Sequence, residues 1–200
     1  MRHAITAVSA GLGSPSASHL LANRLREATE RALASRGEPV RSAIVDLRDH
    51  ARDITNALLT GVPSSSLAMA IDTVTGADGL IAVTPVFNAS YSGLFKMFFD
   101  ILDPDSLTGK PVLAAAAGNS PRHSLIIDHA LKPMFGYLHA MVVPTGVYAA
   151  SQDWGTEDEA LPARIDRAAA ELAALVAGSP VAAPVDPYAN VTSFQDLLGR

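Results

Sequence analysis

The chain has 200 residues, of which 48% are hydrophobic and 18% are charged, and it contains no cysteine. This length and composition predict one globular domain and exclude a disordered chain. The lack of cysteine excludes disulfide scaffolds, cysteine nucleophiles and thiolate metal sites. A net charge of −5 argues against a nucleic-acid partner. There is no apolar run long enough to cross a membrane and no signal peptide, so we expect a cytoplasmic protein.

The first part of the chain alternates β-branched runs with segments whose apolar residues recur at helical spacing. Clusters of Gly, Ser and Pro separate these segments and indicate loops. We predict a strand at 2–9, a loop at 10–18, a helix at 19–36, a strand at 39–46, helices at 53–60 and 65–75, and a strand at 78–84.

The second part continues the same alternation. Pro133 predicts a break or kink, because proline interrupts the helical hydrogen-bond ladder. We predict a helix at 91–102, a strand at 110–117, a helix at 123–139, a strand at 140–149 and a helix at 157–177. The domain is expected to span 1–178, followed by a C-terminal tail at 179–200.

Five predicted strands alternate with helices, and crossovers of this length produce a parallel sheet covered on both faces. The fold class is therefore α/β with three layers. Ligands of such domains bind at the carboxyl ends of the strands. Three loops leave those ends, at 10–18, 84–90 and 118–122.

The first loop carries Gly11 and Gly13, which invite a dinucleotide-binding motif, but Ser16 stands where the third glycine is needed. The loop instead offers hydroxyl groups just before a helix N-terminus, which suits a phosphate monoester. The alternative is that the loop only caps the helix, with Ser18 as the N-cap. The hydroxyl groups belong to Ser9, Ser14, Ser16 and Ser18.

The second loop combines a rigid backbone at Pro85 with the Phe87 ring and the Asn88 amide. These groups suit a flat aromatic ligand with polar edges. The third loop begins at Gly118, which permits close approach of the backbone, and contains one cation, Arg122. Each feature has a simpler alternative, in which the aromatic ring belongs to the core and His123 only begins a helix.

Three segments carry a resemblance to a known family: 9–20, 84–100 (TPVFNASYSGLFKMFFD) and 118–134 (GNSPRHSLIIDHALKPM). With their spacing, they resemble the NAD(P)H-dependent FMN reductases of flavodoxin-like fold. The similarity is greatest to the flavin reductases that serve two-component monooxygenases. The matching region runs from about residue 1 to residue 150.

The resemblance implies a flavodoxin-like sheet of order 2-1-3-4-5, with FMN lying across the three loops. It also implies that a tyrosine at the start of the fourth helix, here Tyr91, lies near the flavin ring and at a subunit contact. The residues implied for the 5′-phosphate are Ser9, Ser16 and Ser18, with His19 as a further candidate. Those implied for the isoalloxazine ring are Pro85, Val86, Phe87, Asn88, Gly118, Asn119 and Ser120.

Family members often carry an arginine in the first loop, and this chain has none there. We therefore expect weak FMN binding. Hydride transfer from NADPH or NADH to FMN is chemistry that the cofactors supply, so no catalytic side chain is predicted. No metal-ligand spacing occurs among the histidines. Arg122 and Lys96 are candidates for contact with an NADPH 2′-phosphate.

Three functions remain open. The leading one is an NAD(P)H-dependent FMN reductase that supplies reduced flavin to a partner monooxygenase. The second is a quinone or azo reductase that holds FMN tightly. The third is a flavodoxin-like electron carrier, which would not turn over NAD(P)H.

A homodimer or homotetramer is expected from the helix at 91–102. Its apolar residues occupy more than one face, and a single core absorbs one stripe, so the remainder would form a subunit contact. These residues are Leu94, Phe95, Phe98 and Phe99. The tail, with Phe194, Leu197 and Leu198, would pack either on a neighbour or on its own domain.

Overall fold

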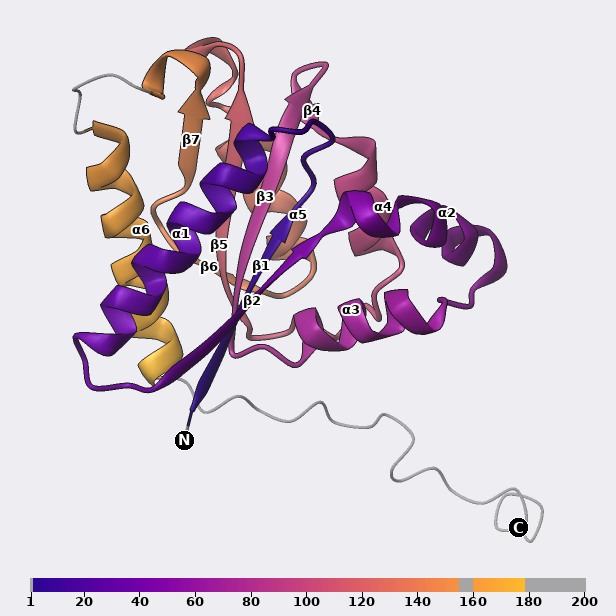
Figure 1. The fold of residues 1–200 in the computed structure, drawn as a ribbon, viewed down its shortest axis with the longest axis horizontal. Coiled ribbons are helices and arrows are strands. Elements are labelled where there is room, and N and C mark those ends of the chain that lie inside the picture. The colour runs from indigo at the N-terminus through magenta and orange to yellow at the C-terminus, as the bar shows by residue number, and fades with distance from the viewer. Residues whose placement is uncertain (1, 155–159, 179–200) are drawn as a thin grey trace, which may run out of the picture.

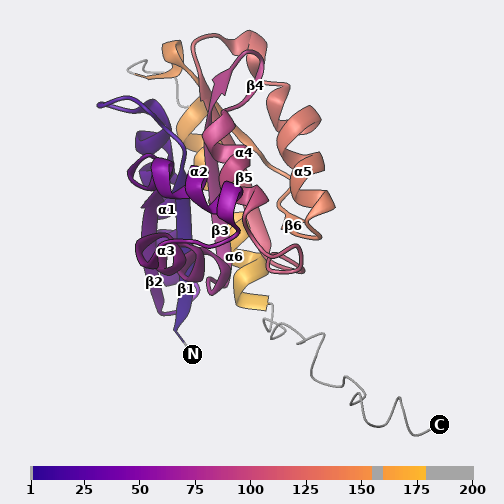
Figure 2. The ribbon, with the colours of Figure 1, turned by 90° about the vertical axis from the view of Figure 1, so that its right-hand side faces the viewer.

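A parallel β-sheet lies between two layers of helices (Figure 1). The computed structural model describes residues 2–154 and 160–178. Two clusters of buried apolar side chains cover the two faces of the sheet. Figure 2 shows the three layers from the side. The predicted three-layer α/β fold is confirmed, whereas the predicted tail lies outside the described residues.

The sheet order is β2 (Val40–Asp46), β1 (His3–Ser9), β3 (Gly79–Phe87) and β5 (Pro111–Gly118), followed by β6 (Met141–Val142). A further strand, β7 (Val147–Ala150), also pairs in parallel with β5. It pairs with the C-terminal half of β5, whereas β6 pairs with the first two residues of that strand. The five strand positions therefore follow the predicted order. The single strand predicted at 140–149 is wrong, because Pro144 has no N–H for the ladder and separates the two short strands.

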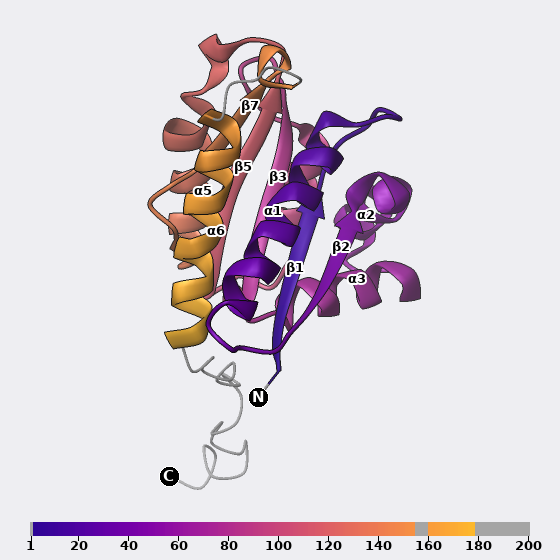
Figure 3. The same ribbon diagram turned by 60° about the vertical axis from the view of Figure 1, so that its left-hand side comes forward.

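One face of the sheet is covered by α1 (Ala17–Ala34) and α6 (Ala160–Gly178), which lie side by side in Figure 3. Their apolar faces meet the alternate residues of β3 and β5. The N-cap of α1 is Ser16, whose Oγ accepts a hydrogen bond from the His19 N–H at 3.2 Å. The expectation that Ser18 caps this helix is therefore wrong, since Ser18 lies inside its first turn and is buried.

The opposite face is covered by α2 (Ala51–Thr60), α3 (Ser65–Thr75), α4 (Gly93–Asp100) and α5 (Lys132–Tyr137). A 3₁₀ turn, η1 (Leu47–His50), leads from β2 into α2. Among the described residues, no single helix is long and apolar enough to span a membrane. The segments Leu47–Thr60 and Ser65–Thr75 meet those criteria only together, with a bend of 92° between them.

The helix predicted at 123–139 consists of three pieces. A 3₁₀ turn, η2 (Pro121–His123), precedes a π-helical turn, η3 (Ile127–Leu131), which continues directly into α5. Pro133 lies in the first turn of α5, where a missing N–H is tolerated. The predicted break is thus real, and the π-helical turn immediately precedes it.

The aromatic side chains of α4 pack inside the chain itself. Phe95, Phe98 and Phe99 are at most 3% exposed. The Phe99 ring lies 4.8 Å from the ring of Phe95 and 5.1 Å from that of Phe135 on α5. The expectation that these phenylalanines form a subunit contact is wrong, because α4 is enclosed between the sheet and its neighbouring helices, which bury both of its apolar faces. Leu94 is half-buried and packs against the same cluster.

Candidate functional site

Three loops meet at one edge of the sheet because the strands that lead into them are aligned. In the ladders, Ser9 of β1 lies opposite Val83 of β3, and Pro85 of β3 lies opposite Ala117 of β5. Parallel pairing places the carboxyl ends of these strands together. The loops predicted at 10–18, 84–90 and 118–122 therefore leave the same edge, as expected for a ligand site in this class of fold.

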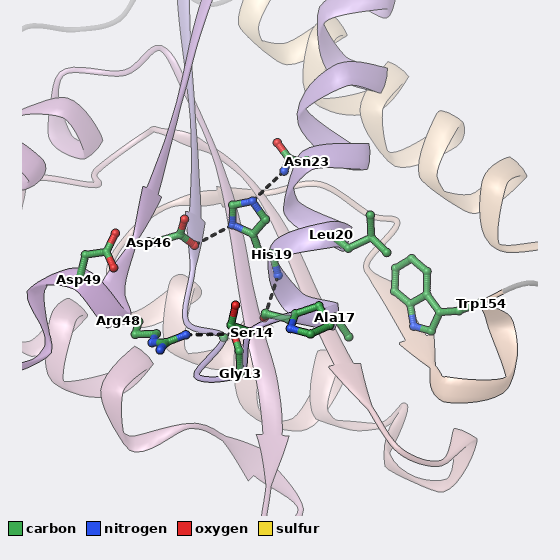
Figure 4. A pocket seen from close by; sticks show the side chains of 13 residues that line it. Gly13, Ser14, Ala17, His19, Leu20, Asn23, Asp46, Arg48, Asp49 and Trp154 are labelled. Carbon is green, nitrogen blue, oxygen red and sulfur yellow. Dashed lines mark hydrogen bonds and ion pairs between the residues drawn. The ribbon is translucent and has the colours of Figure 1, made fainter.

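A cavity of about 740 Å³ opens beside the first loop (Figure 4). Of the residues predicted to bind phosphate, Ser16 and His19 line it, whereas Ser9 and Ser18 are buried and do not. The Ser9 Oγ instead accepts from the Gly11 N–H of the loop at 3.5 Å. The lining residues are Gly11, Gly13, Ser14, Pro15, Ser16, Ala17, His19, Leu20, Asn23, Asp46, Arg48, Asp49 and Trp154.

The first loop folds tightly over the start of α1. A Cβ at Gly11 would fall 1.8 Å from the Ser16 Oγ, so this position requires glycine. The Ser16 hydroxyl accepts from the His19 N–H, and its own proton remains available for a ligand. Together with the free N–H groups of the first helical turn, it forms a cradle for an anion.

Charged side chains surround this cradle. The His19 Nδ1 lies 2.9 Å from the Asp46 Oδ1, and its Nε2 lies 2.9 Å from the Asn23 Nδ2. Both ring nitrogens of His19 thus have partners in the protein. Arg48 donates from Nη1 to the Gly13 carbonyl oxygen at 3.3 Å. Asp49 also lines the cavity, so one arginine faces two carboxylates beside the cradle.

Arg48 is the main site residue that the sequence did not reveal. It follows β2, whose carboxyl end adjoins that of β1, and the ladder pairs Ser9 with Asp46. The segment after β2 is thus a fourth loop at the same edge of the sheet. The order of strands provides the signal that could have found it, because the neighbour of β1 must bring its own carboxyl end to the site.

The second loop is a β-hairpin. Strand β3 continues through Phe87, and β4 (Ser90–Tyr91) returns antiparallel to it. The turn residues Asn88 and Ala89 have φ values of 48° and 65°, the pattern of a type I′ turn. Phe87 is 45% exposed at the tip, so it is not a core aromatic residue. Pro85 and Val86 are half-buried at the base.

The predicted position of Tyr91 at the start of a helix is wrong. Ser92 is the N-cap of α4, its Oγ accepting from the Phe95 N–H at 3.2 Å, and Tyr91 precedes that cap. Tyr91 pairs with Val86 in the hairpin, and its ring lies 6.1 Å from that of Phe95. The hairpin is thus joined to α4 by the side chain expected to contact a ligand.

The third loop is fixed by Tyr148 of β7, which the sequence did not indicate. The Tyr148 hydroxyl donates to the Ser120 carbonyl oxygen at 2.6 Å. A Cβ at Gly118 would fall 2.2 Å from the same hydroxyl oxygen, so glycine is needed there. Asn119 is exposed between them. Burial, and then the negative charge of Asp153, raise the pKa of Tyr148, which keeps this hydroxyl protonated and able to donate.

The structure therefore gathers the twelve predicted residues at one edge of the sheet but does not bring them into one cavity. Ser16 and His19 line the cavity of the first loop. The predicted residues of the second and third loops lie on neighbouring strand ends outside its lining. Among the described residues, no group of three or more histidine, aspartate or glutamate side chains could hold a metal ion.

Comparisons with known proteins agree on one family. A family model described as NADPH-dependent FMN reductase matches residues 4–155. An enzyme of Pseudomonas aeruginosa named FMN reductase (NADPH) is 35% identical over 179 residues, covering 87% of this chain and 92% of that protein. The NADH-dependent FMN reductase SfnF of Pseudomonas fluorescens is 40% identical over 144 residues, covering 70% of this chain and 76% of that protein.

Solved structures show the same similarity. An oxidoreductase from Corynebacterium diphtheriae superimposes with a TM-score of 0.87 at 43% identity, covering 90% of this chain and 99% of that one. The apo form of an NADH:FMN oxidoreductase superimposes with a TM-score of 0.74 at 29% identity, covering 89% of this chain and 92% of that one.

Replacing Tyr148 by phenylalanine should lower the free energy of unfolding by about 1 kcal/mol near pH 8, because the bond to the Ser120 carbonyl is lost. The raised pKa of Tyr148 means that the folded chain holds the phenol proton more tightly than the unfolded chain does. Above about pH 10, the stability of the wild type should therefore fall relative to the Tyr148→Phe variant. Urea unfolding of both proteins between pH 8 and pH 11 measures the difference, and a difference independent of pH would contradict this role of Tyr148.

Proposed function

The chain belongs to the NADPH-dependent FMN reductase family, and we propose that it uses FMN as a diffusing substrate and releases reduced FMN to a partner monooxygenase. Membership answers the question of enzyme or electron carrier, since the chain is an NAD(P)H-dependent FMN reductase. The observation that carries the proposal is the anion cradle at the first loop, which has two carboxylates beside it.

In this proposal, the 5′-phosphate of FMN binds the Ser16 hydroxyl and the free N–H groups of the first turn of α1. The Arg48 guanidinium supplies the positive charge, while Asp46 holds His19 in place. Ser9 and Ser18 are buried behind the loop and support it. The residues proposed along the isoalloxazine ring are Pro85, Val86, Phe87, Asn88, Tyr91, Gly118, Asn119 and Ser120.

The protein groups position the reactants, and the bound flavin and nicotinamide supply the hydride chemistry. Exposed Phe87 offers an aromatic face at the tip of the hairpin, and Gly118 leaves room for the Tyr148 hydroxyl beside the third loop. In the third loop, the Tyr148 hydroxyl holds the Ser120 carbonyl in a fixed position. These features suit two flat rings that must stack and then separate.

Weak retention of FMN follows from the charges at the cradle. A phosphate dianion gains one arginine but faces Asp46 and Asp49 in the same cavity. Nearby like charges raise the free energy of the bound dianion. Loose binding of this kind favours exchange of flavin with solution and its delivery to a second enzyme. A quinone or azo reductase that keeps its FMN remains the alternative.

The same proposal includes a domain that spans 1–178 and works in the cytoplasm as a homodimer or homotetramer. Exposed apolar residues at the end of α5 and on β6, Tyr137 and Met141, offer a surface for self-association in place of the buried phenylalanines of α4. Light scattering at micromolar concentration should give at least twice the monomer mass, and a monomeric mass would rule out this part.

Replacing Ser16 by aspartate should abolish the use of FMN while leaving riboflavin reduction nearly intact. Aspartate and asparagine both cap helices as well as serine does, so the fold of α1 is retained in either variant. Only aspartate adds a negative charge that faces the phosphate. The Ser16→Asn variant is the matched control and should keep most of its FMN activity. Equal losses with FMN and riboflavin in Ser16→Asp would show that the phosphate does not bind at this loop.

Purified wild-type protein should be largely colourless. After gel filtration, we expect little absorbance in the visible flavin band, because the dianion binds loosely beside two carboxylates. Added FMN should nevertheless support steady oxidation of NADPH or NADH. A stoichiometric yellow protein that keeps its flavin through reduction would overturn the diffusing-substrate proposal and favour the quinone or azo reductase.

A further inference from the structure

A second cavity, of about 810 Å³, shares no lining residue with the first. It opens between the π-helical turn η3, the segment that joins β6 to β7, and the N-terminal part of α6. Its lining residues are Ser124, Leu125, Ile127, Asp128, Lys132, Pro144, Thr145, Gly146, Tyr148, Ala160, Ala163, Arg164 and Arg167.

This cavity concentrates positive charge in a chain whose net charge is −5. Lys132, Arg164 and Arg167 line it, and Asp128 is the one carboxylate among its described lining residues. Asp128 pairs with Lys132, its Oδ1 lying 2.7 Å from the lysine Nζ. The acidic residues at 157–159 lie outside the described residues. Both arginines therefore face the cavity without a carboxylate partner among the residues that the structure describes.

The two arginines differ in how they are held. Arg164 donates from Nη1 to the Tyr148 carbonyl oxygen at 3.3 Å, which anchors its side chain at the cavity wall. Arg167 lies three residues further along α6, on the same face of the helix. It forms no ion pair or hydrogen bond with any other described residue. A guanidinium group without a partner among the described residues has donors suited to a phosphate ester.

Tyr148 connects this cavity to the proposed flavin site. Tyr148 lines the cavity, where its carbonyl oxygen accepts from Arg164, and its hydroxyl donates to the Ser120 carbonyl oxygen of the third loop. The cavity and the third loop thus share one wall. A ligand with one end against the flavin ring and an anionic group at the other end could place that group among the cations.

We propose that this cavity binds the 2′-phosphate of NADPH and so gives the enzyme a preference for NADPH over NADH. The inference rests on the proposed flavin site and specifies how the second substrate is recognised. Arg164 and Arg167 would contact the phosphate dianion, and the Ser124 hydroxyl offers a further donor. Lys96, a candidate from the sequence, is paired with Asp100 at 2.5 Å, and neither it nor Arg122 lines the cavity.

Two variants should change the KM for NADPH in opposite directions, and a third serves as the control. Arg167→Met should raise the KM for NADPH about tenfold, which is the loss expected for one charge-assisted contact, and leave the KM for NADH unchanged. Asp128→Asn removes the single described carboxylate and should lower the KM for NADPH only. Arg36→Met is the matched control, because Arg36 is an exposed arginine just beyond the C-terminal end of α1, and it should change neither constant.

Calorimetry with two probes measures the phosphate contact without turnover. Adenosine 2′,5′-bisphosphate should bind the wild type more tightly than adenosine 5′-monophosphate does, and this difference should shrink in Arg167→Met. Equal affinity for the two probes, or an equal rise of both KM values in Arg167→Met, would overturn the proposal. In either case, continued NADH-driven reduction of FMN would leave the proposed function intact, so the two failures can be distinguished.

Discussion

Parallel pairing of β1, β3 and β5 is the constraint on which the functional edge depends. These strands are buried on both faces, and their ladders bring Ser9, Thr84 and Gly118 to one end of the sheet. In β5, Ala114 and Ala116 face one apolar cluster, while Ala115 and Ala117 face the other. Small side chains let helices approach from both sides, and this packing fixes the strand ends from which the loops depart.

The order of elements could be predicted because burial on both faces gives the central strands continuous apolar runs. The errors arose where local pattern and tertiary contact disagree. The run at 140–149 is apolar throughout, yet Pro144 divides it between two short strands. The phenylalanines of α4 occupy two faces of the helix. No sequence pattern reveals that Phe135 of α5 packs against one of these faces.

The loops at the carboxyl edge of the sheet could be predicted from the sequence, whereas the contacts that complete the candidate site could not. Loops after strands are visible as clusters of Gly, Ser and Pro, so the three candidate loops were found. Arg48 and Tyr148 were not, because each acts on a loop that belongs to a neighbouring strand. Their roles depend on which strands are adjacent, and adjacency follows from the fold as a whole. The hairpin was missed for a related reason, since Ala89 carries no turn signal and adopts a positive φ only because β3 and β4 pair around it.

The distribution of charge between the two cavities has a consequence for the affinity of each substrate. Beside the first loop, one arginine is opposed by two carboxylates, whereas the second cavity holds two arginines and a lysine against one described carboxylate. Two phosphate dianions of similar chemistry would therefore bind with different strength at the two places. If the FMN phosphate binds in the first cavity and the NADPH phosphate in the second, as proposed, the nucleotide would be the better anchored substrate. Weaker binding of the flavin phosphate would let the flavin leave readily after each hydride transfer, which the proposed delivery of reduced flavin to a partner enzyme requires.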